Sequence, residues 1–461
     1  MAKMLRLVQN EYIKTWKKVS TKIIFILVFV CALGLIGIAK IAEFAIEEEK
    51  QYLYADTEID YSYDIQEAEK MKYDGYETDI EMYKFLTDNK LTHGDWKLNA
   101  AYSAFNYEVL EDGTVEFTYP EEVRTELLDC IKNNDWKKYC ESMVSGMKEM
   151  GLPEAQYWEY QYRIDNNIPL PTSFEESWTW PNDVIDNVAY SKSALSETTE
   201  VSAESASEKK RLEDSVTLGL YRLENDIELN IADNTSLLAA FTNVNFWLVF
   251  CQSASLISII GLLIIVITGS TIANEFSQGT IKFLLINPVK RWKILVSKYI
   301  MSVSLGLIMI LLLYAASALL SMLFFGTEFI SSEYLEVVDG AVKGTNGFVY
   351  VFRNYMLRSV QVVVMATLAF AISSLVKSSS LAIGISLFAM LSGNTVVTIL
   401  KTALKQDWAR YLIFANTDLA AVADGTTGFA HHSMGFAVAV ILIHLLVFML
   451  IAWDGFTKRE V

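Results

Sequence analysis

The stretch of sequence that decides the fold is TIANEFSQGTIKFLLINPVKRWKILVSKYI, residues 271–300. It separates two long apolar runs but is itself polar and basic, with Lys282, Lys290, Arg291, Lys293 and Lys298. Loops rich in Lys and Arg stay on the cytoplasmic side of a membrane, because moving these cations across the bilayer is disfavoured. We therefore predict a cytoplasmic joint at residues 270–298, on which a soluble partner can act.

The composition is that of a membrane protein with two unlike parts. The 461 residues are 52% hydrophobic, with a mean hydropathy of +0.27, and several apolar runs reach the roughly 18 residues that a bilayer span needs. Residues 41–243 hold 44 of the 55 acids and 17 of the 38 bases, so this block carries −27 and the remainder +10. This separation predicts two compartments with a membrane between them. The acidic block also argues against nucleic acid as a partner.

The apolar runs predict an all-α polytopic membrane protein with six transmembrane helices and both termini cytoplasmic. The predicted spans are 23–41, 243–269, 299–325, 357–376, 381–400 and 434–453. The intervening parts are an acidic extracellular domain (42–242), an extracellular loop (326–356), a segment of short re-entrant or interfacial helices (401–433) and a cytoplasmic tail (454–461).

Residues 1–22 predict a cytoplasmic amphipathic helix that precedes the first span. Leu5, Val8, Tyr12 and Trp16 share one face, and lysines and Arg6 cover much of the rest. Aromatic anchors and long basic side chains are typical of a helix that lies in the interface plane of a membrane. The alternative is a solvated leader helix.

The acidic domain is predicted to be mainly helical. One helix-forming stretch covers 121–150 and ends at Gly-Leu-Pro, residues 151–153. If this stretch is one helix, Cys130 and Cys140 lie too far apart for a disulfide, whereas a turn at residues 133–135 would allow one. Both alternatives stay open.

A short echo occurs within this domain. YRIDNNI at residues 162–168 resembles YRLENDI at residues 221–227, and nothing longer repeats around them. The echo fits either two equivalent helix ends or a coincidence of turn chemistry. We assign no function to it.

Catalytic motifs are missing from the sequence. There is no GxxxxGK[ST], HExxH or GxSxG, and no Cys/His cluster has zinc-ligand spacing, so we expect no enzyme activity and no bound metal or cofactor. The span cores almost completely lack charged residues, which ion-coupled carriers usually keep. Their polar residues either join helices by hydrogen bonds or line a route for an amphipathic substrate: Gln252, Ser255, Gln361 and Asn394. The driving energy is then expected from outside the chain.

The joint predicts a specific local shape. Gly279 can end or bend a helix, and Asn287-Pro288 suits the start of the next one. Between them, the sequence predicts a short amphipathic helix with an apolar surface for a cytoplasmic partner, formed by Ile281, Phe283, Leu284 and Leu285. The alternative is an interfacial loop that only anchors two spans.

At these residues the chain resembles the membrane subunits of ABC-2 type (ATP-binding cassette) exporters. The resemblance rests on Glu275, Gly279-Thr280-Ile281-Lys282, Leu284-Leu285, Pro288-Val289, Arg291 and Lys298. The leader helix, the six spans and the basic C-terminus also fit. The large block between the first two spans is similar to that of the bacterial branch of sodium-export and bacitracin- or lantibiotic-resistance permeases.

The resemblance implies a half-transporter in the bacterial cytoplasmic membrane. A second permease chain, identical or related, completes the pathway, and two separate subunits bind and hydrolyse Mg-ATP. The substrate would be an antimicrobial peptide, a drug or an ion. The coupling residues would be Glu275, Gly279, Thr280, Ile281, Phe283, Leu284, Pro288 and Arg291, and residues 1–22 would be the elbow helix. The alternative function is a membrane sensor or receptor with an extracellular ligand-binding domain.

Overall fold

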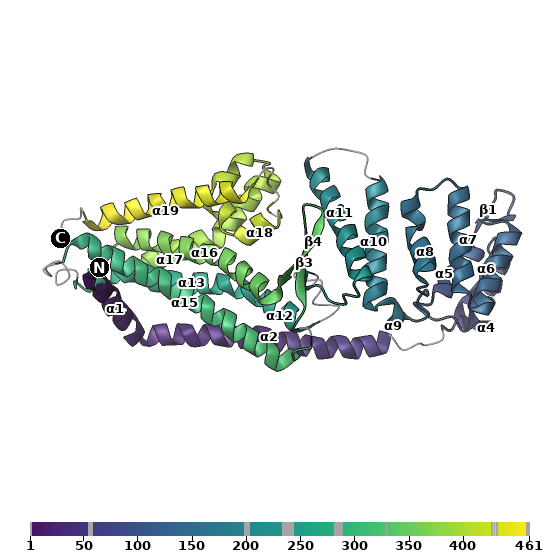
Figure 1. The fold of residues 1–461 in the computed structure, drawn as a ribbon, viewed down its shortest axis with the longest axis horizontal. Coiled ribbons are helices and arrows are strands. Elements are labelled where there is room, and N and C mark those ends of the chain that lie inside the picture. The colour runs from purple at the N-terminus through teal and green to yellow at the C-terminus, as the bar shows by residue number, and fades with distance from the viewer. Residues whose placement is uncertain are drawn as a thin grey trace. The chain divides into compact units, whose positions relative to one another are not determined.

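The computed structural model describes residues 2–53, 59–197, 203–232, 244–280, 289–328, 330–425, 427, 429 and 432–457. The chain divides into two compact units (Figure 1). The membrane unit contains Met1–Phe44, Ile231–Tyr334 and Thr345–Val461, and the insertion unit contains Ala45–Asn230 and Leu335–Gly344.

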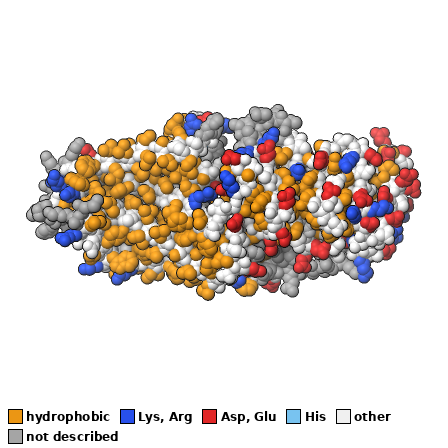
Figure 2. All heavy atoms as spheres, in the orientation of Figure 1, with side chains coloured by type: hydrophobic (Ala, Val, Ile, Leu, Met, Phe, Trp, Pro, Cys, Tyr) orange, Lys and Arg blue, Asp and Glu red, His pale blue; other side chains and the backbone are white. Residues whose placement is uncertain are grey.

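The membrane unit is built from long apolar helices. Its helices are α1 (Ala2–Lys17), α2 (Val19–Leu53, which continues into the insertion unit), α12 (Phe246–Gln252), η3 (Ser253–Leu256), α13 (Ile257–Ser277), α15 (Arg291–Phe325), α16 (Gly347–Leu375), α17 (Ser379–Thr398) and α19 (Met434–Thr457). Six helical segments of the described chain are long and apolar enough to cross a membrane. Hydrophobic side chains cover the visible face of this unit (Figure 2). The prediction of a mainly helical, multi-pass membrane protein is confirmed.

The centre of the membrane unit is the pair α13 and α16. In the span Phe246–Ser277, 61% of the most apolar stretch is buried, and in α16 56%, against 17% in α19. Close packing against α16 explains why position 306 of α15 is a glycine. A Cβ added to Gly306 would lie only 2.9 Å from Val362 of α16. The outer helices therefore leave apolar surface for lipid or another chain, whereas α13 and α16 are fixed by protein neighbours.

The fourth predicted span begins earlier than expected. The sequence predicts a start at residue 357, but α16 begins at Gly347, because the Asn346 side chain accepts hydrogen bonds from the backbone N–H groups of Phe348 and Val349. The expected loop 326–356 is correspondingly shorter. It contains a β-hairpin, β3 (Glu333–Val338) with β4 (Ala341–Asn346).

The described part of the segment before α19 contains short helical pieces, and their predicted re-entrant or interfacial position stays a prediction. They are η4 (Ile399–Ala403), η5 (Asp407–Tyr411), η6 (Ile413–Asn416) and α18 (Leu419–Ala423). His432 holds their ends together, because its ring nitrogens lie 2.8 Å from Asn416 Oδ1 and 3.1 Å from Thr427 Oγ1. Burial and the nearby Arg410 lower the pKa of His432, which favours the neutral form of its ring.

The insertion unit is mainly helical, as predicted, and Asp and Glu side chains gather on its visible face (Figure 2). Its elements are α3 (Ser62–Met71), α4 (Tyr76–Asp88), α5 (Trp96–Ala104), β1 (Tyr107–Val109), β2 (Val115–Phe117), α6 (Glu121–Asn133), α7 (Trp136–Glu149), α8 (Glu154–Asn166), α9 (Phe174–Ser177), α10 (Trp180–Glu197) and α11 (Ala203–Glu224). β1 and β2 are antiparallel, with Glu108 opposite Glu116. Most of the β3–β4 hairpin, Leu335–Gly344, belongs to this unit, and within it Asn230 Oδ1 accepts a hydrogen bond from the Leu335 N–H at 2.9 Å.

The stretch 121–150 is two helices, not one. Asn134 takes a left-handed conformation with φ 54° and separates α6 from α7. The turn brings Cys130 and Cys140 into one buried cluster, but both are free thiols. The disulfide that a turn would allow is therefore absent, and the two cysteines serve as small packing residues.

The sequence echo marks two equivalent helix ends. After α8 and after α11, the backbone N–H of the echo's last residue (Ile168 or Ile227) bonds the carbonyl of its arginine (Arg163 or Arg222), at 2.9 and 3.0 Å. Both arginines are buried. Arg163 donates to the Pro169 carbonyl and Arg222 to the carbonyls of residues 227 and 228. The echo is therefore repeated capping chemistry, in which an arginine satisfies carbonyls beyond its own helix.

Replacing Arg163 with methionine should destabilise the insertion unit by about 2–4 kcal/mol, because the change strands groups that the guanidinium now bonds, including Asn182 Oδ1 at 2.8 Å. Arg211→Met is the matched control. Arg211 is 75% exposed and, among the residues that the structure describes, pairs with Glu208 of its own helix, so its loss should change stability by less than about 0.5 kcal/mol. Denaturant unfolding of the purified chain measures both, and equal effects would contradict this role of Arg163.

Cys130 and Cys140 should resist alkylation in the folded chain. Burial raises the pKa of Cys130 and raises that of Cys140 to about 12, so at pH 8 little reactive thiolate is present. Iodoacetamide labelling followed by mass spectrometry should modify both thiols fully after denaturation without any reductant. Labelling that requires prior reduction would reveal a disulfide and contradict the structure.

Candidate functional site

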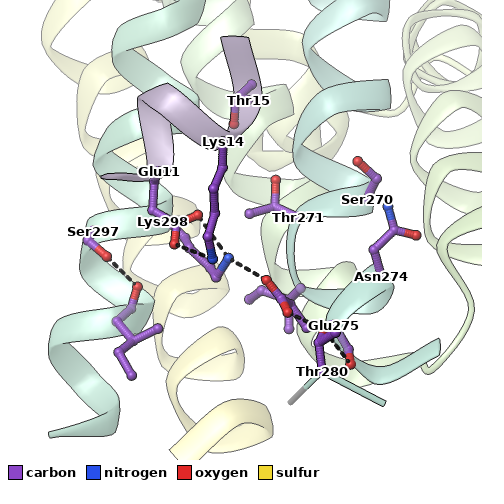
Figure 3. A network of polar contacts seen from close by, with 12 residues as sticks. Glu11, Lys14, Thr15, Ser270, Thr271, Asn274, Glu275, Thr280, Ser297 and Lys298 are labelled. Atoms are coloured by element: carbon purple, nitrogen blue, oxygen red, sulfur yellow. Dashed lines mark hydrogen bonds and ion pairs between the residues drawn. The ribbon is translucent and has the colours of Figure 1, made fainter. Parts of the chain in front are cut away.

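A buried charge cluster joins three helices of the membrane unit at the start of the joint. Lys298 of α15 lies between Glu11 of α1 and Glu275 of α13 (Figure 3). Its Nζ atom is 2.9 Å from Glu11 Oε2 and 3.2 Å from Glu275 Oε1. The lysine side chain is only 3% exposed, and the two glutamates are 11% and 17% exposed. These three residues are named the charge triad.

The triad imposes one arrangement of its helices. Burying an ammonium group costs several kcal/mol unless anionic partners surround it with good geometry. Lys298 meets this requirement only when α1 and the end of α13 both lie against α15. Losing either carboxylate would leave the ammonium partly unpaired, and losing the ammonium would leave two carboxylates together. The triad therefore specifies position more than it adds stability.

Glu275 extends the triad into the joint. Its carboxylate also accepts a hydrogen bond from the Thr280 hydroxyl, and α13 ends at Ser277 just before. Gly279 has φ +69°, the left-handed conformation that commonly follows a helix end. The prediction that Gly279 ends or bends a helix is confirmed. Glu275, Gly279 and Thr280 thus form one short helix exit.

The leader helix α1 is held along α15 by three successive contacts. Tyr12 donates a hydrogen bond to Ser304, Thr15 Oγ1 lies 3.6 Å from Met301 Sδ, and Glu11 binds Lys298. Of its predicted apolar face, Leu5 and Trp16 are exposed, as expected for a helix with one side toward lipid. Val8 and Tyr12 are half-buried.

The turn of α13 before Glu275 is bound to α16 by an unusual contact. The Ser373 hydroxyl oxygen accepts hydrogen bonds from the backbone N–H groups of Ile272 and Ala273, at 3.2 and 3.0 Å. The contact therefore fixes the last turns of α13 to the central helix pair.

Of the other predicted coupling residues, the structure describes only Arg291. Ile281, Phe283, Leu284 and Pro288 lie outside the described residues. Arg291 begins α15 and makes a separate contact, donating to the Thr457 carbonyl at the end of α19, 3.3 Å away.

The four predicted pathway residues do not form one group among the described contacts. Gln361 of α16 lies 3.4 Å from Ser258, one turn beyond Ser255. Ser255 and Asn394 are exposed on different helices, and Gln252 is half-buried. These placements show no lined route within the described part of a single chain.

Two features of the site are absent from the predicted set. Glu11 is the single acid of residues 1–22, which is the signal that could have identified it. Ser373 has no comparable signal, because its partners are backbone groups of a helix about a hundred residues away. No group of three or more His, Cys, Asp or Glu residues in the described ranges could hold a metal ion.

Comparison with known proteins places the membrane unit in a family. The family described as "Protein of unknown function (DUF2705)" matches residues 234–461. The chain is 35% identical over 260 residues to the uncharacterized protein YhcI of Bacillus subtilis, covering 56% of this chain and 79% of YhcI. It is 32% identical over 226 residues to the uncharacterized membrane protein YdbK of the same organism, covering 49% of this chain and 87% of YdbK. The chain therefore belongs to the family of the B. subtilis proteins YhcI and YdbK.

Proposed function

We propose that this chain is the membrane-spanning permease subunit of an ATP-driven ABC exporter. It acts with a second permease chain, identical or related, and with two separate subunits that bind and hydrolyse Mg-ATP on the cytoplasmic side. Both termini and the joint lie in the cytoplasm, and the insertion unit lies outside. The sequence carries no nucleotide-binding motif of its own, so the energy comes from the partner subunits.

The observation that carries this proposal is the charge triad at the entrance of the joint. A partner that pushes on residues 281–288 would act on the helix exit at Thr280, which is bonded to Glu275. Glu275 is bonded to Lys298 and thereby to α1 and α15. Force applied at the joint would thus reach three helices at once. Such an action requires two states with different contacts to the partner.

The Ser373 contact supports the same proposal from the other side. It joins the last turns of α13 to α16, the other central helix of the membrane unit. If the helix exit is displaced, packing should hold the part of α13 that precedes Ile272 in place. The movement would then be concentrated in the residues of α13 that follow Ala273. Motions of this kind are typical of hinges at the ends of elements.

Affinity purification of the chain from its native host should recover an ATP-binding-cassette subunit. The chain purified alone should hydrolyse no ATP, because it has no P-loop, and the complex should hydrolyse ATP. A chain that binds no ATPase but transmits an external ligand signal across the membrane would instead favour the sensor or receptor function.

Replacing Lys298 with methionine should uncouple the movement of α1 from the binding and hydrolysis of ATP by the partner subunits. A fluorophore attached at Leu5→Cys, in a Cys31→Ala background, reports that movement in the assembled complex. The ATP-dependent signal should fall at least about fivefold in the variant, in line with typical coupling energies, while the ATPase subunits stay bound. Lys377→Gln is the control, because Lys377 is exposed and outside the triad. An unchanged signal in the Lys298 variant would contradict the role of the triad.

A further inference from the structure

A polar pocket lies beside the charge triad. Its volume is about 480 Å³, within the range of ligand sites in proteins. Helices α1, α13 and α15 provide most of its walls (Figure 3). The lining includes Lys14, Lys18, Asn274, Gln278 and all three residues of the triad.

The charge balance of this pocket favours an anion. Both triad carboxylates are engaged with Lys298. Lys14 lies at a longer distance, 3.9 Å from Glu11 Oε1, and its side chain is 60% exposed. Lys18 is also exposed and forms no ion pair with any described residue. Three lysines and two glutamates line the pocket, so it has an excess positive charge at the side that α1 provides.

Two uncharged amide side chains also line the pocket. The side-chain amides of Asn274 and Gln278 form no hydrogen bond with other groups in the ranges that the structure describes, and both residues line the pocket. Two lysines and two amide groups along one pocket match the several acceptor oxygens of a phosphate group.

The position of α1 identifies the source of that phosphate. The helix exposes Leu5, Ile13 and Trp16, which are 67%, 46% and 51% exposed. A helix with such a face and with basic residues lies at the lipid headgroup level of a membrane. Basic pockets between the polar ends of membrane helices are suited to anionic lipid headgroups.

We propose that this pocket binds the phosphate group of an anionic phospholipid, with Lys14 and Lys18 as the cationic contacts and Asn274 and Gln278 as neutral donors. The site does not depend on the transport function. It places a lipid phosphate next to the pocket wall formed by Glu275 and Lys298, so the anionic lipid content of the membrane can influence the triad.

The experiment measures thermal unfolding of the purified full chain in detergent during titration with phosphatidylglycerol. The wild type should gain stability, because the lipid binds the folded chain. Lys14→Gln with Lys18→Gln should weaken the apparent affinity about 10- to 30-fold, given the usual contribution of a lysine near an anionic headgroup. Lys17→Gln with Lys22→Gln is the control of equal charge: both lysines are exposed nearby, and neither lines the pocket. This control should bind like the wild type.

Four further measurements separate lipid binding from other effects. Phosphatidylcholine should give no comparable stabilisation, and neither should inorganic phosphate or glycerol 3-phosphate. Asn274→Leu, which removes a neutral donor without changing charge, should also weaken the phosphatidylglycerol effect. The proposal is overturned if the lipid does not stabilise the wild type, if both lysine pairs lose the effect equally, or if soluble phosphate alone reproduces it.

Discussion

The arrangement of three helices in the membrane unit depends on the burial of one ammonium group. Lys298 lies within α15, a helix whose other residues between Ile294 and Phe325 are uncharged, and a lone cation there would be strongly disfavoured. Glu11 and Glu275 make its burial possible by approaching to 2.9 and 3.2 Å. They come from positions 264 residues apart in the chain, so the pair can form only when the leader helix and the second span are both in place. This constraint fixes α1, α13 and α15 together.

The same ion pairs place a polar, charged group at the C-terminal end of α13, which together with α16 is otherwise largely apolar. On the N-terminal side of this charged group, α13 and α16 pack closely, and the Ser373 hydroxyl accepts hydrogen bonds from the backbone of Ile272 and Ala273. On its C-terminal side, the Glu275 carboxylate accepts a hydrogen bond from the Thr280 hydroxyl, where the chain leaves the helix. Fixed packing on one side and a bonded helix exit on the other form a boundary at which motion can be localised.

The sequence predicts the helices well, because long apolar runs and charge asymmetry depend on local composition. It also identifies Glu275 and the left-handed position at Gly279. It does not predict Glu11 or Ser373 as partners of these residues, since both contacts form between helices distant in the chain. The β3–β4 hairpin was missed for a similar reason: it is held by Asn230, whose amide bonds the backbone of Leu335 from another part of the chain.

The claim that the charge triad makes α1 and the end of α13 move as one body can be tested by pulsed electron paramagnetic resonance. Spin labels at Leu5→Cys and Gln278→Cys report the distance between the two elements, and labels at Leu5→Cys and Lys377→Cys report the movement of α1 relative to the α16–α17 turn. In the complex with its ATPase subunits, adding ATP should leave the first distance unchanged and alter the second. A change in the first distance of the same size as in the second would contradict the account.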